Sequence, residues 1–436
     1  MHMFSNINNR YLIGLLLCTV LLFSVVSSGT QAKETITAWH VDTSKSEQLP
    51  LEYAKRQFEK THPNINLKLV AMNDEAFKTK LKVAGMGGKL PDMFITWGGG
   101  RMETYVDAGR LVDLTPMINK SGLDKKISEA TLNAATYKGK TWAVTPAGAA
   151  VVAFWYNKNV FEKYNISVPS TWKELKEAAG KLKSEGVIPF ALANSTRWPG
   201  TEWYEYLVYR LGGRDEYEKA QKKNSDIDFT NEVFIEAGKK LQELVKKDYF
   251  NQGFNSLSYG QGQSRTLVYT GRAAMELMGN WWYASAKSEV PEFAKENLGV
   301  FAFPKIEGVE GVDPTTIVGS PGGGNFWSIS KSCDNVDAAF DFLEILTKKR
   351  STELYIEGGS LPVIKGRQSL VKDPINKKVY KLFTKASYVK DYWNVALPPA
   401  IYEVHLDATQ AMLDLSITPE EYGQKMQKAV EDYYSN

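Results

Sequence analysis

Indole side chains that stand beside short polar ones are the residues of this chain whose types and spacing suggest chemistry. Four places have this character: three lie around Trp97, Trp198 and Trp393, and the fourth is the segment GNWW. An aromatic ring can pack against the C–H face of a sugar, while neighbouring polar groups bind its hydroxyls. The pattern therefore predicts sugar contacts from these indoles. The polar neighbours expected to share the site with Trp198 are Asn194, Arg197 and Glu202.

Trp97 and Trp393 each lie next to residues that indicate a turn or loop. Trp97 ends the apolar segment MFITW and is followed by three glycines, which would let the backbone approach a ligand closely. Trp393 and Asn394 come shortly before two prolines. The alternative for Trp97 is that it covers the core beneath a turn.

Short polar residues follow the first two expected strands and occur again late in the chain. The candidates for binding hydroxyl groups are His40 and Asp42, Asn73 and Asp74, and Asn325 in GGGNFW. An Asp or Asn in such a loop is often a helix cap or a turn residue instead, so that role stays open for each of them.

The segment GNWW contains two adjacent indoles, Trp281 and Trp282. Neighbouring side chains point to opposite faces of a strand and diverge by about 100° on a helix. One regular element therefore cannot easily bury both rings in the same core. A change from strand to helix is expected near Asn280, and one of the two indoles is left for another role.

The elements that must position these residues begin with an alternation of strands and helices. Strands are expected at 34–41, 65–71 and 93–97, with helices between them that end near His62 and Ala84. This order is typical of a parallel α/β sheet, whose ligands bind beyond the carboxyl ends of the strands. Trp97 and the polar residues after the first two strands lie at those ends.

The rest of the chain is richer in helix. Thr171 and Glu174 predict a capping box at the start of a helix, and a strand is expected at 187–194. Segment 297–305 is interpreted as an extended connector. Further helices are expected at 233–247, 336–349 and 419–434.

Composition excludes several classes of protein. Without residues 1–32, which contain Arg10 and no acid, the chain has 52 basic and 50 acidic residues, and no run of like charges suggests a nucleic-acid partner. Cys333 is then the only cysteine, and His40, His62 and His405 lie far apart, so neither a disulfide nor a zinc site is expected. No nucleotide-binding or hydrolase motif occurs, and no cofactor is expected. The length favours two domains.

Residues 1–32 have the layout of a secretory signal peptide. Arg10 precedes the apolar run 11–28, and Thr30 and Ala32 are small residues at the places needed for cleavage. An uncleaved membrane anchor is the alternative. Cys18 lies inside the apolar run, so a lipoprotein anchor is poorly supported. The protein is expected to work at the outer face of the cytoplasmic membrane or in the periplasm.

Several segments, taken in order, resemble the extracellular sugar-binding proteins of bacterial ABC importers, family 1, the maltose- and oligosaccharide-binding group. They are AKRQFEKTHPNINLKLV, GKLPDMFITW, DAGRLVDLTPMI, the block 137–179, TGRAAMELMGNWW and the block 322–346. Each motif is weak alone, but the ordered set spans nearly all of the chain after residue 32.

The resemblance implies a two-lobed α/β fold of the type II periplasmic-binding-protein kind, with hinge strands between the lobes. It assigns residues 33–146 and 302–347 to the N-terminal lobe, and 147–301 and 348–436 to the C-terminal lobe, with crossovers near 145–146, 300–304 and 347–349. Such a protein is a monomer that closes on its ligand and delivers it to membrane permease subunits. Trp281 resembles the stacking tryptophan of the family, which leaves Trp282 as its packing partner.

The sequence departs from the maltose-type pattern at Ala149 and Ala150, where that group commonly has an acid. Small residues there suggest room for an acetamido group, so chitin oligosaccharides are preferred to maltodextrins as a hypothesis. Two other functions stay open. A secreted glycoside hydrolase would need a pair of carboxylates about 5–10 Å apart, and a receptor for a charged solute would need several acids or bases in its cleft.

Overall fold

The computed structural model describes residues 33–146, 148–222, 225–323 and 326–435, and Thr35–Asn436 forms one compact unit. Among the described residues, no helix has both the length and the apolar character needed to cross a membrane. The predicted signal peptide and Asn325 lie outside the described residues.

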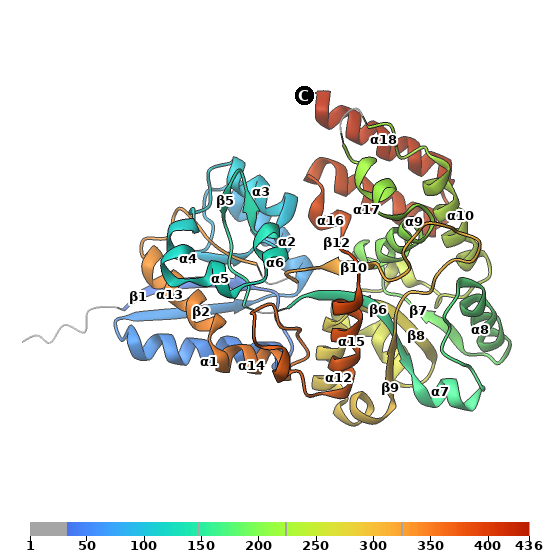
Figure 1. Cartoon of the computed structure of the whole chain (residues 1–436), viewed down its shortest axis with the longest axis horizontal. Helices are drawn as coiled ribbons and strands as arrows, with labels where there is room; N and C mark the ends of the chain where they lie inside the picture. The colour runs from blue at the N-terminus through green and yellow to red at the C-terminus, as the bar shows by residue number, and fades with distance from the viewer. Residues whose placement is uncertain (1–32, 147, 223–224, 324–325, 436) are drawn as a thin grey trace, which may run out of the picture. The chain divides into compact units, whose positions relative to one another are not determined.

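A four-stranded sheet has the order β11-β3-β1-β2. Its strands are β1 (Glu34–His40), β2 (Ile65–Ala71), β3 (Met93–Ile95) and β11 (Trp327–Ile329). β1 and β3 are parallel, with Ala38 opposite Met93, whereas β11 runs antiparallel to β3. The predicted strand–helix alternation is therefore confirmed for this sheet, although its last strand comes from far along the chain (Figure 1).

The helices of this region follow from caps and apolar spacing. Ser44 and Glu47 form a capping box at the start of α1, and α1 buries Leu51, Ala54 and Phe58. Asn73 caps α2. The elements here are α1 (Lys45–Thr61), α2 (Asp74–Met86), α3 (Gly99–Asp107), α4 (Thr115–Ser121), α5 (Leu123–Lys126), α6 (Glu129–Ala134), the hairpin β4 (Thr136–Tyr137) and β5 (Lys140–Thr141), α13 (Val336–Thr347) and α14 (Lys349–Glu357).

A second sheet has the order β12-β10-β6-β8-β7, with β9 paired to β6 outside that path. Its strands are β6 (Ala150–Asn157), β7 (Ile188–Ala191), β8 (Ala273–Gly279), β9 (Leu298–Phe301), β10 (Ile317–Ser320) and β12 (Val389–Asp391). The sequence suggested an extended connector here, but β9 is a strand of the sheet. It pairs antiparallel with β6, with Phe154 opposite Phe301 and Asn157 opposite Leu298.

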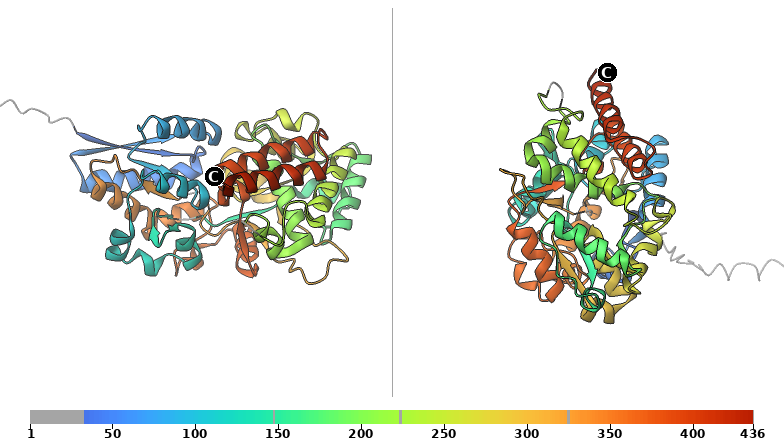
Figure 2. Two further views of the ribbon diagram at one scale, coloured as in Figure 1. Left: turned by 90° about the horizontal axis from the view of Figure 1, so that it is seen from above. Right: turned by 90° about the vertical axis from the view of Figure 1, so that its right-hand side faces the viewer.

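Helices surround the second sheet. The capping box predicted at Thr171 and Glu174 is present, and the last helix matches the prediction within a residue. Figure 2 shows α17 and α18 side by side near the C-terminus. The helical elements are α7 (Lys158–Lys163), α8 (Trp172–Ser184), α9 (Trp198–Lys219), α10 (Glu232–Lys246), η1 (Phe254–Ser256), η2 (Tyr259–Gln261), α11 (Gln263–Tyr269), α12 (Trp281–Glu289), η3 (Phe293–Asn297), η4 (Gln368–Leu370), α15 (Pro374–Lys385), α16 (Trp393–Ala396), α17 (Pro399–Leu413) and α18 (Pro419–Ser435).

Candidate functional site

A cavity of about 260 Å³ lies where the ends of several elements meet. From the four-stranded sheet it is lined by residues that follow β1, β2 and β3, as the carboxyl-end rule for open sheets predicts. From the remainder of the chain it is lined by the first turn of α9, by η2, by the start of α12 and by the segment before and within α16. The cavity therefore joins residues from position 41 to position 395.

Four aromatic residues form one wall of this cavity, and we call them the aromatic cluster: Trp198, Tyr259, Trp281 and Tyr392. Their rings meet edge to face. The ring centroids are 5.2 Å apart for Trp198 and Tyr259, 5.9 Å for Trp198 and Trp281, and 6.3 Å for Trp281 and Tyr392. Such contacts fix the rings relative to one another, so the cluster offers a preformed aromatic surface.

The strand-to-helix corner GNWW explains how its two indoles are separated. β8 ends at Gly279, where a Cβ would lie 2.1 Å from the Trp281 ring, so only glycine leaves room for that ring to fold back. Asn280 accepts a hydrogen bond of 3.0 Å from the Val151 N–H, which ties the corner to β6. Trp281 then lines the cavity.

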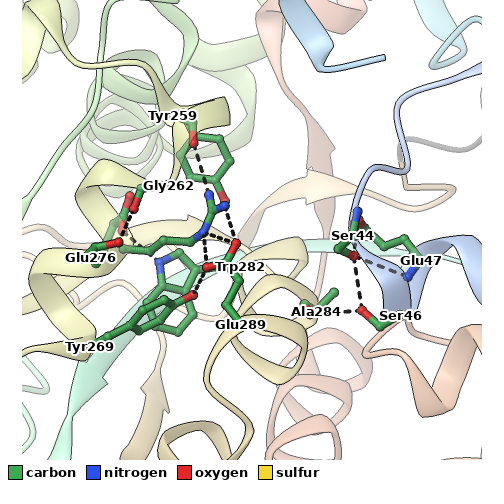
Figure 3. A network of polar contacts seen from close by, with 12 residues as sticks. Ser44, Ser46, Glu47, Tyr259, Gly262, Tyr269, Glu276, Trp282, Ala284 and Glu289 are labelled. Carbon is green, nitrogen blue, oxygen red and sulfur yellow. Dashed lines mark hydrogen bonds and ion pairs between the residues drawn. The ribbon is translucent and has the colours of Figure 1, made fainter. Parts of the chain in front are cut away.

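Trp282 points into the core instead. It is fully buried and stacks on Trp155 with the ring centroids 5.7 Å apart. Its indole N–H donates a hydrogen bond of 2.8 Å to Glu276, whose other oxygen accepts one of 2.7 Å from Ser264 (Figure 3). Of the two indoles, Trp282 is therefore the one that packs in the core. Burial raises the pKa of its partner Glu276 to about 7.

Several buried polar atoms of the cavity wall have no hydrogen-bond partner among the described residues. They include Asp42 Oδ2, both carboxylate oxygens of Glu202, the hydroxyls of Tyr259, Tyr355 and Tyr392, and Asn394 Oδ1. Buried polar groups in native proteins are almost always paired, and exceptions require an explanation. A ligand rich in hydroxyl groups would supply the missing partners.

The cations of the cavity wall already have partners within the protein. Arg265 donates to Glu289 at 2.6 Å and to the Tyr259 carbonyl at 3.1 Å (Figure 3), and Lys78 is paired with Asp74. Arg101 donates a hydrogen bond of 2.8 Å to the Asn394 carbonyl. Burial, and then Glu47, raises the pKa of Asp42 well above its usual range.

Seven of the residues predicted from the sequence line the cavity. They are Trp97, Trp198, Trp281, Asp42, Asn73, Asp74 and Glu202. Asn73 also caps α2, so the alternative considered for it holds at the same time. Their contact with a ligand stays a prediction.

Four other predicted residues lie elsewhere. Trp393 is fully buried, stacked on Tyr217 at 4.5 Å. His40 is buried near Trp327, and burial lowers its pKa to about 4. Asn194 accepts a hydrogen bond of 2.8 Å from the Gly200 N–H and so supports the start of α9. Arg197 is paired with Asp407 at 2.6 Å and with Glu403 at 3.0 Å.

The structure adds cavity residues that the sequence did not indicate. Tyr392 lines the cavity beside Asn394, which the sequence had indicated together with Trp393, and Arg101 directly follows the three glycines. For Tyr259 and Tyr355 the sequence contains no local signal. The glycines themselves accommodate another part of the protein, because a Cβ on Gly100 would lie 2.7 Å from the Leu397 carbonyl oxygen.

Comparison with known proteins gives matches to a family model, to curated relatives and to solved structures. The family model described as bacterial extracellular solute-binding protein matches residues 42–353. An uncharacterized ABC transporter extracellular-binding protein of Pyrococcus horikoshii is 30% identical over 307 residues, which are 65% of this chain and 68% of the relative.

Two solved structures resemble the chain over almost its whole length. One comes from work on xylan utilization by the thermophilic bacterium Caldanaerobius polysaccharolyticus. It is 30% identical, the match covers 90% of this chain and 99% of that one, and the TM-score is 0.83. The other is a chitin oligosaccharide binding protein, 25% identical, with 93% and 100% of the two chains covered and a TM-score of 0.84.

Proposed function

The chain belongs to the bacterial extracellular solute-binding proteins, and from this membership we propose that its cavity captures an oligosaccharide for delivery to an ABC importer. The family and its sugar-binding relatives are substrate-binding proteins and not enzymes. The type II two-lobed α/β fold predicted from the sequence is confirmed by the solved structures.

The observation that carries the proposal is the combination of aromatic surface and unpartnered polar atoms in one cavity. The aromatic cluster suits the C–H face of a sugar ring. Asp42, Glu202, Asn394 and three tyrosine hydroxyls supply hydrogen-bonding atoms for its hydroxyl groups. The proposed ligand contacts are the seven predicted residues that line the cavity, together with Tyr259, Tyr392 and Asn394.

We propose chitin oligosaccharides as the ligand class. Gly148, Ala149 and Ala150 line the cavity with small side chains, which leaves room for an acetamido group. The similar chitin oligosaccharide binding protein supports the same class. Isothermal titration calorimetry with chitobiose, maltotriose and xylotriose tests it, the last because a similar structure comes from work on xylan utilization. Binding of maltotriose alone would contradict the chitin proposal.

The capture mechanism that we propose is closure of two lobes around the ligand, as the family implies. The lobe division 33–146 with 302–347 and 147–301 with 348–436 stays a proposal, and we propose two changes to it. β10 pairs with β6 of the second sheet, and α14 packs on α1 beside the first. These contacts support assigning β10 to the C-terminal lobe and α14 to the N-terminal lobe.

An exported location follows from the family. We propose that residues 1–32 direct export and are removed after Ala32, and that the mature protein is a monomer. Mass spectrometry of the exported protein tests the cleavage, with Lys33 as the expected first residue. A product that retains the apolar run 11–28 would show an uncleaved anchor instead.

A further inference from the structure

Glu202 differs from the two buried acids beside it. The three side chains of Glu202, Glu205 and Glu276 are at most 1% exposed. One oxygen of Glu205 accepts hydrogen bonds from the backbone N–H of Trp393 at 3.1 Å and from the Tyr217 hydroxyl. Its other oxygen lies 3.3 Å from His405 Nε2. Glu276 is paired with Trp282 and Ser264. Neither oxygen of Glu202 has a partner within the described chain, and of these three only Glu202 lines the cavity.

The setting of Glu202 connects its carboxyl group to the aromatic cluster. Glu202 lies one turn after Trp198 on α9. Burial raises the pKa of Tyr392 well above its usual range, and Glu202 is the next cause of that rise. The carboxyl group therefore lies close enough to the Tyr392 hydroxyl to act on its titration.

A buried carboxyl group without partners is costly in the empty cavity. Leaving a buried polar group unpaired costs about 1–3 kcal/mol, and more when the group is charged. A core-forming role would be served better by a residue of similar volume without polar oxygens. Two free oxygens of one carboxyl group match two adjacent donor groups, such as the vicinal hydroxyls of a sugar ring.

We propose, on the basis of the oligosaccharide-binding function proposed above, that Glu202 determines specificity by accepting hydrogen bonds from two adjacent hydroxyl groups of an uncharged sugar ring. The same carboxyl group excludes a ring that carries a carboxylate. The charged groups that act on Glu202 are Glu205 and Glu276, both acids, so a further negative charge beside Glu202 would be repelled.

The isosteric variant Glu202→Gln separates this role from a structural one. Burial and the two neighbouring acids raise the pKa of Glu202 well above its usual range, so an uncharged amide is less costly to bury at neutral pH. The variant should therefore melt at the same temperature as the wild type or higher. Its affinity should nevertheless fall, because a carboxyl group that ionises when two hydroxyl donors reach it offers two acceptor oxygens, whereas an amide offers only one.

The test is calorimetry on the full mature chain with chitobiose, xylotriose and maltotriose as neutral probes and trigalacturonate as the acidic probe. The wild type should bind at least one neutral probe and no trigalacturonate. Glu202→Gln should bind that neutral probe about tenfold to a hundredfold more weakly. Glu276→Gln is the matched control, a buried acid outside the cavity, and should keep the wild-type affinity.

Three results would overturn the proposal while leaving the proposed function intact: an unchanged affinity of Glu202→Gln, an equal loss in Glu276→Gln, or tight binding of trigalacturonate by the wild type. Wild-type protein that binds none of the neutral probes would overturn both. If Glu202→Gln does not fold, Glu202→Asp is the second variant. It keeps an ionisable carboxyl group, withdraws its oxygens by one methylene and should also lose tenfold or more in affinity.

Discussion

At the scale of single residues, two tryptophans that are adjacent in the sequence have different roles in the structure. Trp281 and Trp282 open the same helix, yet one lines a cavity and the other stacks on Trp155 in the core. The difference arises from Gly279 and Asn280, which make room for the first ring and tie the corner to β6. Replacing Trp281 should therefore affect ligand binding, whereas replacing Trp282 should affect the stability of the fold.

Trp281→Ala should weaken binding of the best neutral oligosaccharide by 1 kcal/mol or more, on the order of one stacking contact plus lost burial, with little loss of stability. Trp282→Ala should lower the free energy of unfolding by about 3–5 kcal/mol, because it leaves a cavity and an unpaired Glu276 oxygen. Calorimetry and urea unfolding measure the two effects. Equal stability losses in both variants would contradict this division.

Glu276 makes stability depend on pH. Its pKa is raised from 4.5 to about 7 in the folded protein, chiefly by burial, so the folded state binds a proton that the unfolded state releases between those values. The contribution is fully present below pH 4.5 and is lost as pH rises through 7, by up to about 3 kcal/mol. Urea unfolding from pH 5 to 8 should show this decline in the wild type relative to Glu276→Gln. Parallel curves for the two proteins would exclude the assignment.

At the scale of elements, the close approach of α3 to the segment 395–397 leaves no room for one added methyl group. A Cβ on Gly100 would lie 2.7 Å from the Leu397 carbonyl oxygen, and Arg101 on the next position donates to the Asn394 carbonyl. α3 follows the first sheet, whereas segment 395–397 follows β12 of the second. The glycines thus let two elements that both line the cavity approach each other.

Gly100→Ala should force α3 away from this segment and weaken oligosaccharide binding by tenfold or more, because both elements carry cavity residues. Gly85→Ala on α2 is the matched control. Its Cβ would meet the side chains of Tyr105 at 3.4 Å and Leu90 at 3.9 Å, which are ordinary contact distances. Alanine there should stabilise the helix by about 0.5–1 kcal/mol. Calorimetry and thermal unfolding of both variants decide the matter, and an unchanged affinity of Gly100→Ala would refute the expectation.

At the scale of the whole molecule, the cavity draws on segments that are more than 350 positions apart, from Val41 to Val395. A ligand that contacts all of them binds the folded chain and cannot bind the unfolded one. Binding therefore stabilises the fold by an amount that grows with the ligand concentration relative to the dissociation constant.

The melting temperature should therefore rise with the concentration of a bound oligosaccharide, corresponding to about 2.7 kcal/mol at a hundred times the dissociation constant. Differential scanning fluorimetry over chitobiose, xylotriose and maltotriose measures it. Trp281→Ala should need a higher concentration for the same rise. A melting temperature that no oligosaccharide changes would argue against the proposed function.

The sequence by itself determined the local elements and the ordered motifs of the family. The alternation in INLKLVA and the caps at Thr171 and Asn73 depend on residues a few positions apart, so they are visible in the chain. For the same reason the sequence indicated Trp97, which follows a strand and lines the cavity in the structure.

Only the tertiary structure decided which neighbour in a short turn faces the ligand site and which distant segments complete it. Trp393 entered the core while Tyr392 and Asn394 took the cavity wall, because α16 packs on α3 and α17. Tyr259, Tyr355 and the pairing of β9 and β10 with β6 depend on contacts between residues far apart in the chain. Such contacts leave no periodic pattern nearby, since their free energy is gained only when the whole fold brings the segments together.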